Sequence, residues 1–66
     1  MARKLEHGDS VRILGGMAEF IGQTGYILGE KGTMLRVRMD RPVHVEGVGE
    51  ITSDLWERRF LRKLRG

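Results

Sequence analysis

Apolar and polar residues alternate along much of this chain with the two-residue period of a β-strand that buries one face. The clearest run is Thr33 to Met39, where apolar residues occupy one face and arginines the other: Leu35, Val37 and Met39 against Arg36 and Arg38. Ser10 to Leu14 and Thr24 to Leu28 repeat the pattern, with Tyr26 expected on the outside. These three runs predict three half-buried strands.

Glycines and the single proline divide the runs. Gly15-Gly16 ends the first strand, and Gly29 to Gly32 has the length of a common hairpin turn. Pro42 predicts the end of the third strand, because proline cannot donate to a central ladder. A fourth strand is expected to begin at Val43, to bulge at residues 47–49 and to resume at residues 50–52.

The end of the chain allows two interpretations. Ser53-Asp54 is able to cap a helix that continues through residues 55–64. Alternatively, Asp54 to Trp56 forms one helical turn before a last strand, in which Phe60, Arg62 and Leu64 share a face. We favour the turn and strand, because a five-stranded barrel needs a closing strand here.

The first hairpin carries a set of residues that resembles the KOW motif family: Gly8, Asp9, Val11, Ile13, Gly16, Gly22, Gly25 and Ile27. This family consists of small SH3-like barrels found in ribosomal proteins and in NusG-type transcription factors. Asp54-Leu55 and the alternation after it are similar to the turn and closing strand that many such barrels share. The resemblance implies a binding module in transcription or translation.

The expected fold is therefore all-β: one small five-stranded antiparallel SH3-like barrel with a short helical turn before the last strand. We expect an N-terminal arm at residues 1–7 and a single barrel domain at residues 8–66. The expected core consists of apolar residues from every strand and from the turn: Val11, Ile13, Ile27, Leu35, Val37, Ile51, Leu55 and Phe60.

Composition argues against catalysis and against bound cofactors. The chain has 66 residues, no cysteine and only two histidines, His7 and His44, which are not at a ligand-like spacing. It has no Ser-His-Asp set and no phosphate-cradling glycine loop before a helix, so we expect no enzymatic activity. No run is apolar enough for a membrane span or a signal segment, so we expect no membrane partner and a cytoplasmic location.

Charge suggests nucleic acid as a partner, either RNA or DNA. The net charge is +3, and the basic excess is concentrated after Glu57. Arginines beside an aromatic ring form a surface on which a base stacks while a guanidinium meets phosphate. The alternative to a binding surface is a solvated basic face without a ligand. The candidate nucleic-acid-binding residues are Arg12, Tyr26, Arg36, Arg38, Arg58, Arg59, Arg62 and Lys63.

The loop from Met17 to Ile21 supports a second hypothesis, in which the chain is a protein-docking or assembly module. This loop is largely apolar, whereas RNA-binding KOW members usually carry lysines and glycines there. Its apolar residues either plug the barrel or contact a partner, and self-association remains open. Trp56 is either core or an exposed anchor, since tryptophan is enriched in interface hot spots. The candidate partner-binding residues are Phe20, Ile21 and Trp56.

Overall fold

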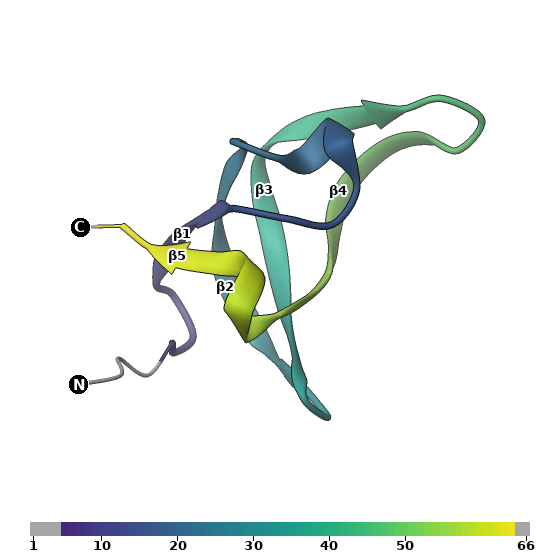
Figure 1. The fold of residues 1–66 in the computed structure, drawn as a ribbon. Coiled ribbons are helices and arrows are strands. Elements are labelled where there is room, and N and C mark those ends of the chain that lie inside the picture. Colours follow the sequence, from purple (N-terminus) through teal and green to yellow (C-terminus); the bar gives the residue numbers. More distant parts are fainter. Residues whose placement is uncertain (1–4, 65–66) are drawn as a thin grey trace.

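The computed structural model describes residues 5–64 as a strongly curved antiparallel sheet (Figure 1). Its elements are β1 (Ser10–Ile13), the 3-10 turn η1 (Ala18–Phe20), β2 (Thr24–Lys31), β3 (Met34–Val45), β4 (Gly49–Glu57), the 3-10 turn η2 (Arg58–Phe60) and β5 (Leu61–Lys63). The strand order is β4-β3-β2-β1-β5, so the predicted five-stranded all-β fold is confirmed. β4 and β5 form the two edges, and the sheet is not closed into a barrel. Residues 1–4 of the expected arm and Arg65 of the basic tail lie outside the described residues.

Gly25 allows the backbones of β2 and β3 to approach each other closely. It pairs with Val11 on β1 and with Met39 on β3. A Cβ atom at this position would lie 2.3 Å from the backbone oxygen of Arg38. Only glycine therefore lets β2 and β3 approach this closely at the bend.

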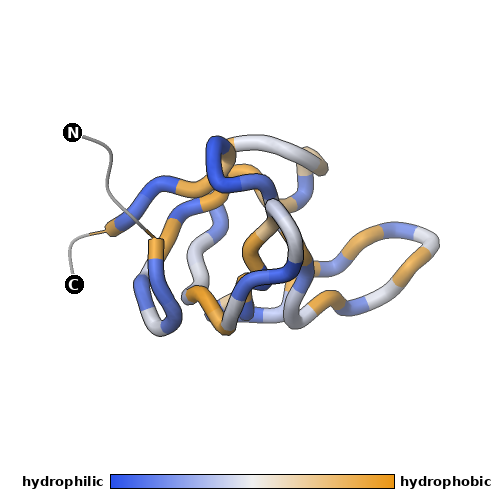
Figure 2. The backbone as a smooth tube through the Cα atoms, turned by 90° about the horizontal axis from the view of Figure 1, so that it is seen from below, coloured by the Kyte–Doolittle hydropathy of each residue, from blue (hydrophilic) through white to orange (hydrophobic). Residues whose placement is uncertain are grey.

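The predicted break at Pro42 is wrong, because β3 continues through it to Val45. The pairing of β3 with β4 changes register between Arg38 and Val43, and Pro42 lies exposed within that irregular segment. A proline that lies where the ladder is interrupted removes no regular hydrogen bond. Glu46 to Val48 then form the turn that was expected to be a bulge. The resulting β3–β4 hairpin extends away from the other strands, and its alternating hydropathy is visible in Figure 2.

The end of the chain forms a turn and a strand, as favoured, but the turn is displaced along the sequence. Asp54 to Trp56 belong to β4, and the helical turn is η2, at Arg58–Phe60. The predicted facing of the last strand is also wrong. Leu61 is the buried residue of β5, whereas Arg62 is exposed and Phe60 is only partly buried.

The core contains five of the predicted residues and six others. Val11, Ile13, Ile27, Leu35 and Val37 are buried, as predicted. Ile51, Leu55 and Phe60 are only partly buried. Ile51 lies on the edge strand β4, Leu55 lies opposite Arg36 on the outer face of the sheet, and Phe60 belongs to η2. The remaining buried residues come from η1, the far half of β3, and the last strands: Phe20, Met39, Val43, Val45, Trp56 and Leu61.

The loop between β1 and β2 supplies a plug for the concave side. Phe20 is 1% exposed, and its ring meets the Trp56 ring edge-on, with the centroids 5.0 Å apart. Its neighbours Met17 and Ile21 point outward, with 48% and 52% of their surfaces exposed. The loop therefore buries one aromatic ring and leaves two large apolar side chains at the surface.

Candidate nucleic-acid interface

The convex face of the sheet presents a row that includes an aromatic ring and a cation. Tyr26 on β2 pairs directly with Arg38 on β3, and Ser10 and Ser53 extend the row on either side. Tyr26 is 36% exposed and Arg38 is exposed. Because residues directly opposite on paired strands have neighbouring side chains, this ring and this guanidinium form one surface.

Two further rows bring arginines to the same face. Arg12 on β1 lies opposite Arg62 on β5 and opposite Thr24 on β2. Arg36, which is partly buried, lies between Gly29 on β2 and Leu55 on β4. We call the combined surface the arginine face; it consists of Arg12, Tyr26, Arg36, Arg38 and Arg62.

Ion pairs separate the basic residues into two groups. Three predicted site residues are paired within the chain: Arg58 with Glu30, Arg59 with Glu57 (Nε to Oε1, 3.0 Å) and Lys63 with Asp9 (Nζ to Oδ2, 3.6 Å). By contrast, no carboxylate of residues 5–64 lies within 4.0 Å of a guanidinium of the arginine face. The C-terminal basic run is therefore not one cluster, and of its described members only Arg62 joins this face.

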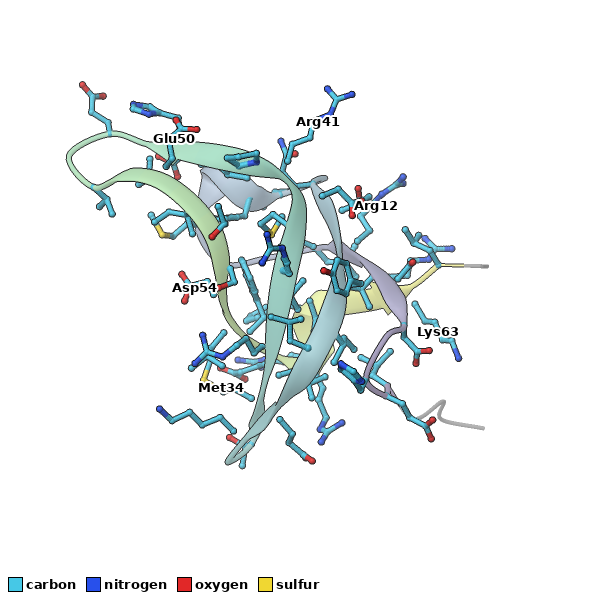
Figure 3. The ribbon with its side chains drawn as sticks, turned by 180° about the vertical axis from the view of Figure 1, so that it is seen from behind. Arg12, Met34, Arg41, Glu50, Asp54 and Lys63 are labelled. Carbon is cyan, nitrogen blue, oxygen red and sulfur yellow. The ribbon has the colours of Figure 1, made fainter. Side chains whose placement is uncertain are left out.

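Sequence reasoning missed Arg41, which it had assigned to a break between strands. In Figure 3, Arg12 and Arg41 project from neighbouring parts of the molecule, and Lys63 lies farther along the same side. Arg41 lines a shallow polar recess with Thr24 and Asp40, which are joined by a 2.7 Å hydrogen bond from the threonine hydroxyl. Local alternation gave no signal for this, because it places Arg41 on the core face with Met39 and Val43; its exposure follows from the shift of register with β4 between Arg38 and Val43.

The three predicted partner-binding residues do not form one exposed patch. Phe20 and Trp56 pack against each other in the core, and Trp56 is 5% exposed. Ile21 is the exposed member.

Comparison of the chain with protein-family models, with curated proteins and with solved structures found no match in any of the three. The resemblance to KOW proteins therefore stays a prediction. Within residues 5–64 there is no group of three histidine or acidic side chains placed to hold a metal ion. The same residues include no helix that is long and apolar enough to cross a membrane.

Proposed function

We propose that this protein is a non-enzymatic binding module that contacts nucleic acid, RNA or DNA, through the arginine face. One observation carries the proposal: four arginines share one face of the sheet with an exposed tyrosine, and none of them has a carboxylate within 4.0 Å among the described residues. Guanidinium groups bind phosphate bidentately, and a nucleobase stacks on an aromatic ring. The role in transcription or translation is part of the proposal and rests on the KOW resemblance.

The pairing of Arg12 with Arg62 supports an anionic ligand. Like charges directly opposite each other on neighbouring strands destabilise a sheet. Here no described carboxylate lies within 4.0 Å of either guanidinium. A phosphate that lies between the two side chains would replace the repulsion with two charge-assisted hydrogen bonds.

The direct test is fluorescence anisotropy of a labelled twelve-nucleotide single strand, as RNA and as DNA, at about 50 and 200 mM salt. If four arginines each neutralise one phosphate, the logarithmic salt slope is about −2.8 for a single strand, and affinity falls about 50-fold over this range. An Arg36→Ala/Arg38→Ala variant halves the number of contacts and reduces the loss to about sevenfold. Its binding at 50 mM salt should also be weaker.

The matched control is Arg58→Ala/Arg59→Ala, which removes the same net charge. Because both of these guanidinium groups are already paired with glutamates, this variant should keep nearly the whole salt slope. Absence of binding by the unaltered protein at 50 mM salt would refute the proposal. Equal losses in the two double variants would show that net charge, and not the arginine face, governs binding.

A further inference from the structure

A second surface lies on the concave side of the sheet, where the β1–β2 loop, β4 and η2 meet. It is a largely apolar pocket of about 270 Å³, walled by Met17, Phe20, Trp56 and Phe60. Asp54 lies at its rim on β4. Figure 3 shows Asp54 on the opposite side of the molecule from Arg12, Arg41 and Lys63. The pocket therefore lies away from Arg12, and it meets the arginine face only where Leu55, one of its lining residues, is paired with Arg36. Binding at the pocket does not depend on the function proposed for that face.

The first polar group of the pocket is the indole N–H of Trp56. No described residue accepts a hydrogen bond from Trp56 Nε1, yet no buried polar side-chain atom of residues 5–64 lacks a partner. The Nε1 atom therefore keeps some contact with solvent, although the Trp56 side chain as a whole is only 5% exposed. A Cβ atom on Gly16 would lie 3.2 Å from it, and the φ of Gly16 is +97°. Glycine at this position keeps the donor uncovered.

The second polar group is the carboxylate of Asp54. Its Oδ1 accepts the backbone N–H of Leu55 at 2.8 Å, and no cation of the described chain lies within ion-pair distance. Asp54 and Trp56 are two residues apart on one strand, so their side chains leave the same face. Glu57, the other acid at the pocket, is already paired with Arg59.

The acidic residues of β4 indicate which kind of ligand the pocket binds. This edge strand carries Glu50, Asp54 and Glu57 and no basic residue. A nucleic-acid phosphate would be repelled by Asp54, and a second copy paired through β4 would bring two acidic edges together. A basic, extended peptide is complementary in charge and able to fill an apolar pocket.

We propose that this pocket binds an extended segment of another protein in which an apolar side chain is flanked by lysine or arginine. The apolar side chain lies between Trp56, Phe60 and Met17. A backbone carbonyl of the segment accepts the Trp56 indole N–H, and the flanking cation pairs with Asp54. The partner is thus recognised by one apolar anchor, one hydrogen bond and one ion pair.

Trp56 is the only tryptophan of the chain, so its emission reports directly on the pocket. The probe is a capped seven-residue peptide that alternates lysine and valine. Capped peptides that alternate lysine with serine, and glutamate with valine, test the apolar and the charged requirement separately. The lysine–valine peptide should change Trp56 emission in a saturable way, and the other two should bind at least tenfold more weakly.

Two pairs of variants localise the binding, with anisotropy of the labelled peptide as a second measurement. Asp54→Asn preserves an oxygen for the Leu55 N–H but removes the charge, so affinity should fall three- to fivefold, as expected for one exposed ion pair. Glu50→Gln, on the same strand but outside the pocket, should bind normally. Met17→Ser should weaken binding, whereas Ile21→Ser, equally exposed in the same loop, should not.

Three results would overturn the proposal. The first is no change in emission or anisotropy up to about 1 mM lysine–valine peptide. The second is equal affinity for the glutamate–valine peptide. The third is equal behaviour within either pair of variants. A concentration-dependent change in Trp56 emission without peptide, together with a dimer by sedimentation, would assign the pocket to a second copy of the chain instead.

Discussion

The pair of Arg12 and Arg62 allows stability and binding to be changed in opposite directions. Arg62→Glu replaces a like-charge cross-strand pair with an attractive one on an exposed face. Such a pair contributes about 0.2–1 kcal/mol, so we expect the free energy of unfolding to rise by about 0.5–1 kcal/mol. For a domain of this size that corresponds to a Tm about 2–8 °C higher. The same substitution removes a phosphate contact and should weaken nucleic-acid binding.

The assay is thermal unfolding followed by circular dichroism at about 20 mM and 1 M salt. The gain should shrink at 1 M salt, where the Debye length falls to about 3 Å. Arg12→Glu should give a similar gain, and the double variant, which restores like charges, should lose it. This double-mutant cycle isolates the pair from the change in net charge. A lower Tm for Arg62→Glu at low salt, or a gain that persists in the double variant, would refute the reasoning.

Three substitutions test the fold. Gly25→Ala places a Cβ atom against the Arg38 carbonyl and should lower the free energy of unfolding by about 1–3 kcal/mol in urea titrations, the usual range for overpacking; unchanged stability would contradict the close approach. Phe20→Ala should cost about 3–5 kcal/mol, because this ring is buried against Trp56; a loss below about 1 kcal/mol would show that it does not plug the sheet. Val37→Asp should leave the chain unfolded by circular dichroism and one-dimensional NMR, because an unpaired buried charge costs several kcal/mol against a total stability of about 3–10 kcal/mol; a folded variant would reverse the assignment of faces.

The first three strands were predictable because local alternation alone determines which side chains are buried. Val11 and Val37 each lie between two polar residues in a run with a two-residue period, and both are buried. The boundary of β3 was not predictable from Pro42. A proline excludes a regular ladder position, but the shift of register with β4 creates a position that needs no donor. That shift depends on a strand that follows later in the chain.

The facing of the last strand was predicted wrongly for a related reason. Phe60 and Leu61 are adjacent apolar residues, and alternation cannot say which of them enters the core. The choice depends on η2, which turns the chain after Glu57 and places Leu61 opposite Ile13 on β1. Phe60 then lies over Gly15, where a Cβ atom would come within 2.5 Å of its ring. This contact joins segments that are distant in the sequence.

In the candidate site, too, the direction of a side chain was predictable from nearby residues, whereas its ion pairing was not. The outward direction of Arg12, Tyr26 and Arg38 follows from the strand period, and each is exposed. The strand period does not indicate whether an arginine is already paired with a carboxylate. Arg58 contacts Glu30, which is 28 positions away. Arg58 and Arg62 are both arginines of the same basic run, but in the folded chain Arg58 is paired with a carboxylate and Arg62 is not paired with any described one.

The net charge of +3 conceals two surfaces of opposite character. The arginine face carries cations with no described carboxylate within 4.0 Å, and Asp54 on β4 has no described cation within that distance. The like-charge pair of Arg12 and Arg62 lowers the stability of a small chain that has little to spare. A ligand that binds only the folded state returns that stability, by about 2.7 kcal/mol at 100 times its Kd. The two proposed ligands are opposite in charge, so rising salt should weaken both without exchanging their sites.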